Sequence, residues 1–78
     1  MTNEKVVQII QAVLAVDRAQ DAVLIAQWDV NFFESRDRKA GSVSAPSAEA
    51  RTRLYEREKA AAIAMERFHL IMGSSDVV

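Results

Sequence analysis

The first half of this chain carries an apolar repeat with a period of seven residues. Two apolar positions per seven residues place one continuous stripe along an α-helix, whereas a strand would require strict alternation. The small members of the repeat would let a neighbouring helix approach closely. The repeat therefore predicts one long helix that packs against a second. Its members are Ile9, Val16, Val23 and Val30, followed three positions later by Ala12, Ala19, Ala26 and Phe33.

Glycine and proline cluster at one interior place in the chain. Residues 3–39 and 47–72 contain neither, whereas residues 40–46 contain Gly41, Pro46 and two serines. Such a cluster is typical of a loop. We therefore expect a single all-α domain over residues 1–78, an antiparallel two-helix hairpin with helices at about 3–39 and 45–72. Residues 73–78 follow as a flexible C-terminal tail.

The residues at the expected helix ends suit those positions. Thr2 or Asn3 can accept a hydrogen bond from the first turn of the first helix. Gly41 can end that helix in the left-handed conformation. The second helix can begin at Ser44 or Ser47, because a serine hydroxyl is a favoured cap.

The second helix carries a thinner apolar stripe than the first. Its large members near the seam include Leu54, Met65 and Phe68, and alanine fills most of residues 60–64. Counting outward from the loop places Val16 near Phe68 and Val23 near residues 61–63. The two stripes are therefore expected to form one seam between antiparallel helices.

The first helix has more apolar surface than one partner helix can cover. Of the 28 positions from Val6 to Phe33, 19 are apolar, whereas a helix covered on one face needs only about three or four per two turns. If the alanines are discounted, the helix is closer to an ordinary amphipathic one, and a monomer with an exposed groove is the alternative. The surplus forms a second stripe of Val6, Ile10, Leu14, Leu24 with Ile25, Trp28 and Phe32.

Self-association is the simplest consequence of this surplus. A two-helix hairpin is also close to the lower size limit for a stable single core. We expect a homodimer in which two hairpins form a four-helix bundle with two-fold symmetry. The expected self-association residues are Ile9, Val16, Val23, Val30, Phe33, Leu54, Met65 and Phe68.

A partner-binding surface is expected near the turn. Trp28, Phe32 and Tyr55 lie there in the predicted hairpin, close to Arg51 and Arg53. Tryptophan, tyrosine and arginine contribute most of the binding energy at many protein interfaces. The alternative is that Trp28 and Phe32 belong to the core of the dimer.

Candidate sites for chemistry are weak. Glu66 and His69 show the Glu-x-x-His spacing of di-iron carboxylate bundles, and Asp17 and Asp21 would have to complete such a site from the facing helix. Solvated side chains on a helix flank account for the same four residues. The chain has no cysteine, one histidine and no glycine-rich phosphate loop. We therefore expect no enzymatic activity and no cofactor.

Charge and hydropathy give no sign of a nucleic-acid or membrane partner. Ten lysines and arginines stand against eleven acidic residues. Seven basic residues gather in 36–59, but four acidic residues are interleaved with them, and nucleic-acid binding favours an unbroken basic surface. The apolar run 6–16 lacks the basic start of a signal peptide and is shorter than the about 20 residues that span a bilayer. We expect a cytoplasmic protein.

Taken together, these features favour a non-enzymatic protein-binding module. Such a module would be a small adaptor, chaperone or inhibitor that self-associates and docks on a larger protein. Accessory proteins of phages and mobile elements often have this size and lack catalysis. This similarity is one of general type, and no sequence motif carries it. Two alternatives stay open: a structural subunit of a larger helical assembly, and a metal-binding bundle that uses Glu66 and His69.

Overall fold

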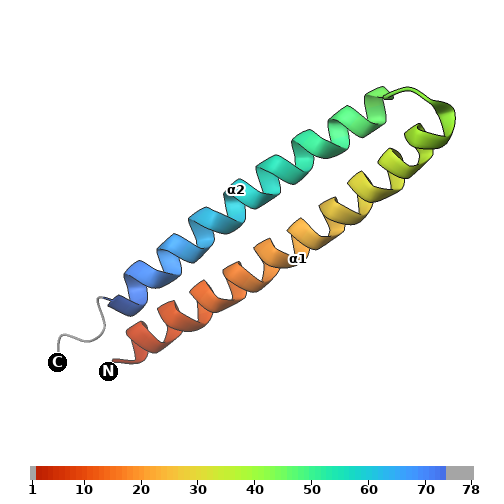
Figure 1. The fold of residues 1–78 in the computed structure, drawn as a ribbon. Coiled ribbons are helices and arrows are strands. Elements are labelled where there is room, and N and C mark those ends of the chain that lie inside the picture. Colours follow the sequence, from red (N-terminus) through yellow and green to blue (C-terminus); the bar gives the residue numbers. More distant parts are fainter. Residues whose placement is uncertain (1, 74–78) are drawn as a thin grey trace.

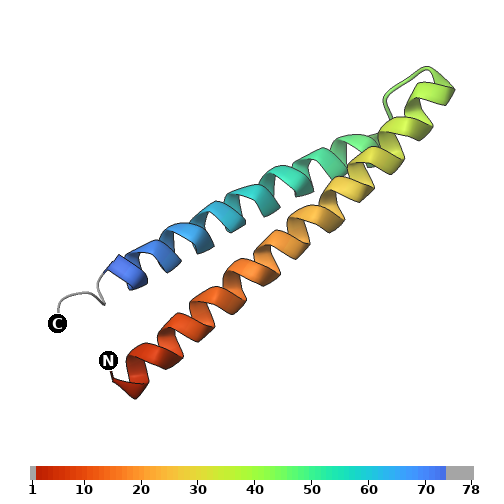
Figure 2. The same ribbon diagram turned by 60° about the horizontal axis from the view of Figure 1, so that its bottom comes forward.

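The computed structural model describes residues 2–73, which form two long helices joined by a short loop. Helix α1 spans Asn3–Ala40 and helix α2 spans Ala45–Gly73. The helices lie side by side and run in opposite directions, in a rod of 60 × 14 × 13 Å (Figure 1). Figure 2 shows the same pairing from a second direction. The predicted all-α helical hairpin is confirmed. Gly73, the first residue of the predicted tail, is instead the last residue of α2, and residues 74–78 of that tail lie outside the described residues.

Both ends of α1 carry the predicted caps. The Thr2 hydroxyl oxygen accepts a hydrogen bond from the backbone N–H of Lys5 at 3.2 Å, so Thr2 is the N-cap. At the other end Gly41 has φ of 78°, in the left-handed region that a side chain disfavours. Its N–H donates to the carbonyl oxygen of Asp37 at 2.8 Å, which satisfies one carbonyl of the last turn.

Helix α2 begins directly after Ser44, the first of the two predicted candidates. The Ser44 hydroxyl oxygen accepts a hydrogen bond from the backbone N–H of Ser47 at 3.4 Å, and its carbonyl oxygen accepts one from Ala48 at 3.2 Å. Pro46 lies in the first turn, where its missing N–H leaves no hydrogen bond unmade. Residues 41–44 remain as the non-helical connection.

The seven-residue repeat forms the contact between α1 and α2. All eight of its members are buried or half-buried in the hairpin. Val16 and Phe68 line the same hollow, and Val23 and Ala61 line another. The predicted register is therefore confirmed.

The core of this seam is thin. Among residues 2–73 the buried apolar side chains are only those of Ala12, Ala26, Val30 and Ala50. Three of the four are alanines, whose small side chains bring the helices together but contribute little buried area. Since hydrophobic stabilisation is roughly proportional to the apolar area removed from water, a single hairpin has little to offset its loss of conformational entropy.

Candidate protein-binding surface

The second apolar stripe of α1 is exposed along its whole length. Trp28 keeps 68% and Phe32 63% of their surface accessible. At about 100° per residue, the exposed apolar residues of α1 fall in one sector of about 120°, nearly opposite the seam with α2. We call these residues the outer face of α1: Val6, Val7, Ile10, Val13, Leu14, Leu24, Ile25, Trp28 and Phe32.

Helix α2 has fewer large exposed apolar residues than α1. They are Tyr55, Ile63, Leu70 and Met72, and Tyr55 is 67% exposed. Scattered apolar residues of this kind are normal on a protein surface, whereas contiguous apolar patches mark interaction sites. The outer face of α1 is therefore the stronger candidate for a binding surface.

The predicted partner-binding residues lie on both helices near the turn. Trp28 and Phe32 are one helical turn apart on the outer face of α1, while Arg53 and Tyr55 are exposed on α2. Within residues 2–73 no ring contact joins Tyr55 to Trp28 or Phe32, and the Phe32 ring packs edge-on against Phe33 at 5.3 Å. Arg53 and Tyr55 are two residues apart in α2, about 200° around the helix, so they point to different sides. The five residues therefore do not form one packed cluster.

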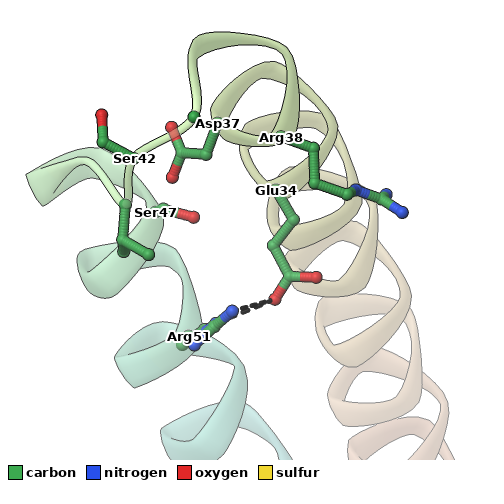
Figure 3. Close-up of a pocket in the computed structure, with 8 residues that line it drawn as sticks. Glu34, Asp37, Arg38, Ser42, Ser47 and Arg51 are labelled. Atoms are coloured by element: carbon green, nitrogen blue, oxygen red, sulfur yellow. Dashed lines mark hydrogen bonds and ion pairs between the residues drawn. The ribbon is translucent and has the colours of Figure 1, made fainter.

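Arg51 ties the two helices together at the turn. Its guanidinium group lies 2.7 Å from a carboxylate oxygen of Glu34 (Figure 3). Both side chains are substantially exposed, and an exposed ion pair contributes only about 0–1 kcal/mol. The ion pair therefore adds little to the stability of the turn, and the exposed part of the Arg51 side chain stays available to a partner.

Sequence reasoning missed Asp37, the buried acid of the turn. Its carboxylate accepts a hydrogen bond from the backbone N–H of Ser44 at 2.9 Å and so connects the end of α1 to the start of α2. This hydrogen bond is the main reason why the pKa of Asp37 is lowered, and burial opposes it. The signal was available, because Asp37 follows Val30 by seven residues and continues the repeat.

Ser47 completes the polar end of the seam. It is only 1% exposed, and its hydroxyl points into the space between the helices (Figure 3). Within the described residues this hydroxyl has no partner at hydrogen-bond geometry, although it also helps to lower the pKa of Asp37. Beyond Phe33 and Ala50, the apolar seam thus gives way to buried polar groups at the turn.

Acid is expected to loosen the turn through Asp37. Because its pKa is lowered in the folded chain, the hydrogen bond to Ser44 stabilises the hairpin fully above the ordinary aspartate value of about 3.9 and is lost as pH falls through the lowered folded value. Thermal unfolding of the parent and of Asp37→Asn should be followed from pH 7 to pH 2. The parent should lose more stability in acid than the variant, and equal losses would remove this role from Asp37.

The predicted self-association residues occupy the seam of the hairpin itself. Val30 is buried, and the other seven are half-buried. They contribute first to the packing of α1 on α2, and any contact with a second copy would use the part of each side chain that stays accessible. That contact stays a prediction.

The metal-site alternative receives no support from the geometry. Glu66 and His69 are exposed on α2, and the His69 ring packs against the Phe68 ring at 5.9 Å. Across residues 2–73, no three histidine, aspartate or glutamate side chains gather closely enough to hold a metal ion. A single hairpin therefore does not assemble the four ligands that the hypothesis requires.

Comparisons and hydropathy add two findings. No protein-family model, curated protein or solved structure matches this chain. Over the described residues, neither helix combines the length and the apolar character needed to cross a bilayer. The proposal for function therefore rests on the surface of the hairpin.

Proposed function

We propose that this protein is a non-enzymatic protein-binding module that self-associates and docks on a larger protein. The observation that carries the proposal is the outer face of α1, which presents two exposed apolar patches, residues 6–14 and 24–32, on either side of Asp17 and Asp21, on a hairpin with a thin core. Within this class, an adaptor, a chaperone or an inhibitor would each use such a face in the same physical way: an amphipathic helix buries its apolar side against a partner.

The accessible surface of the chain supports self-association. It amounts to 6057 Å², whereas a compact monomer of 8.7 kDa exposes about 4,700 Å². The difference of about 1,300 Å² exceeds the about 800 Å² that each partner buries in a standard protein interface. A second copy can therefore cover the surplus and supply the core that one hairpin lacks.

The exposed residues of α2 near the turn suit a larger partner. Tyr55 and Arg51 are four residues apart and therefore lie on the same side of α2, where Arg51 also pairs with Glu34, whereas Arg53 is exposed on another side of the helix. Tyrosine and arginine are the side chains most often found at the centre of interfaces. A structural subunit of a larger helical assembly is the second candidate, because the same apolar face would give open polymers if the contacts between copies did not close.

Light scattering behind size-exclusion chromatography, over a range of concentrations, tests the proposal. We expect a closed dimer or small oligomer whose mass is a multiple of 8.7 kDa and whose population rises with concentration. Polymers that keep growing with concentration would favour the structural subunit instead. A helical monomer at every concentration would contradict self-association and leave only the docking part of the proposal.

A further inference from the structure

The apolar pattern of the outer face of α1 is nearly palindromic about position 19: it reads almost the same toward the N-terminus as toward the C-terminus. Each large apolar residue on one side of this point has an apolar counterpart at the same distance on the other side. The exception is Val7, whose counterpart is Asn31. The matched pairs are Val6 with Phe32, Ile10 with Trp28, Val13 with Ile25 and Leu14 with Leu24, and nearest the centre Asp17 is matched with Asp21.

From this symmetry we infer that the outer face of α1 binds the same face of a second copy, antiparallel, about a two-fold axis that crosses α1 at the level of Ala19, on the side away from α2. The inference rests on the self-association proposed above and names its surface and direction. In a two-fold contact, residue i touches residue j of the partner while j touches i, so the pattern on each copy must be self-complementary. An antiparallel pair of α1 helices meets this condition at four apolar pairs, and its only mismatch among the matched positions is Asp17 facing Asp21 at the centre.

The antiparallel direction also matches large side chains with smaller ones. Trp28 of each copy would face Ile10 of the other, and Phe32 would face Val6. In a parallel pair, Trp28 would instead face Trp28 of the other copy, and the smaller residues near the N-terminus of α1, such as Val6 and Ile10, would face each other. Because interfaces pack as densely as protein interiors, the alternation of large and small residues favours the antiparallel pair.

The length of the face also fits a second copy. From Val6 to Phe32 the outer face extends over 26 helical steps, which is about 39 Å at 1.5 Å per residue. The α1 of a second copy has this length by construction. Helix α1 would then lie between α2 on one side and the partner's α1 on the other, which accounts for its apolar character nearly all round.

The pairing divides the predicted binding residues between two roles. Trp28 and Phe32 belong to the contact between copies. Tyr55 and Arg53 lie on α2, away from the axis, and stay accessible for a larger partner.

Engineered cysteines test the direction of the pair, because the chain has no cysteine of its own. Leu14→Cys and Leu24→Cys are prepared separately, mixed and mildly oxidised. Both positions are about half exposed in the hairpin, so the fold should tolerate either change. We expect a disulfide between the two variants in the mixture and little or none in either variant alone. In the antiparallel pair, like positions are offset by about 15 Å along the helix, beyond the about 7 Å that a disulfide spans.

The other outcomes are equally decisive. A disulfide in Leu14→Cys alone would indicate a parallel pair and overturn the inference while keeping self-association. A dimer by light scattering that forms no disulfide in any combination would place the contact on another face. A monomer would overturn both this inference and the self-association on which it rests. Ala60→Cys, exposed on α2, is the matched control and should not cross-link.

The acidic centre gives a second measurement that does not depend on cysteine geometry. In the antiparallel pair, Asp17 of each copy faces Asp21 of the other, and like charges in such positions are unfavourable. The double variant Asp17→Asn with Asp21→Asn should lower the dissociation constant about two- to fivefold. An unchanged or raised dissociation constant would contradict the placement of the axis near Ala19.

Discussion

Replacing Ala50 by glutamate is expected to unfold the hairpin. Ala50 is 1% exposed and lies on the face of α2 that packs against α1, next to Arg51, which pairs with Glu34. A glutamate there must either bury an unpaired carboxylate or push the helices apart, and changes of this kind cost about 4 kcal/mol or more. Natural domains are stable by only about 5–15 kcal/mol. Circular dichroism should therefore show a large loss of helix and of cooperative melting.

The same substitution at Ala48 is the control. Ala48 lies two residues earlier in α2 and is exposed, so a glutamate there stays in water. It also falls in the first turn, where a negative charge is favourable. The free energy of unfolding of Ala48→Glu should be within about 0.5 kcal/mol of that of the parent. If Ala50→Glu were as stable as Ala48→Glu, the seam would not run through Ala50 and the register of the hairpin would be wrong.

The fold could be predicted because local signals and the long-range pattern agree. The seven-residue repeat from Ile9 to Phe33 requires a helix with a partner, and Gly41 and Ser44 mark the ends where the chain turns back. One loop leaves an antiparallel neighbour as the simplest arrangement. Counting residues outward from the loop then gives the register of the two helices. It is confirmed because Val16 lies beside Phe68 and Val23 beside Ala61.

The polar end of the seam was harder to predict. Asp37 occupies a position that an apolar residue would normally fill, so its charge obscured its place in the repeat. Its carboxylate is accepted there because the backbone N–H of Ser44 donates to it. Only the conformation of the turn shows that this donor is close enough. Charged residues at apolar positions of a repeat therefore have to be judged together with the free backbone donors near them.

The binding surface was predicted in part, for a different physical reason. Periodicity separates the seam of α1 from its outer face, so the exposed stripe from Val6 to Phe32 was expected. The periodicity of one helix does not say which residues of this surface bind a second copy and which bind a larger protein. Trp28 illustrates this, because a core position in a dimer and a docking position for another protein require the same large apolar side chain.

Truncating Trp28 to alanine is expected to weaken self-association while leaving the hairpin helical. Trp28 is 68% exposed in the single hairpin, so its removal costs the fold of one chain little. In the proposed dimer it faces Ile10 of the second copy, and two such contacts are lost per dimer. Truncation of a tryptophan that is buried in an interface can cost about 2 kcal/mol or more, which corresponds to about a 30-fold rise in the dissociation constant. Sedimentation equilibrium of the parent and the variant measures this change.

Tyr55→Ala separates the two roles of the exposed aromatic residues. Tyr55 is as exposed as Trp28 but lies on α2, outside the proposed contact between copies. Its truncation should leave the dissociation constant of the dimer unchanged. If both variants left it unchanged, Trp28 would belong to the surface for a larger protein and the two-fold contact would lie elsewhere. A third outcome is that Trp28→Ala loses its helix even at high concentration. The hairpin would then need Trp28 in order to fold, which would contradict the exposed position of this side chain in a single hairpin.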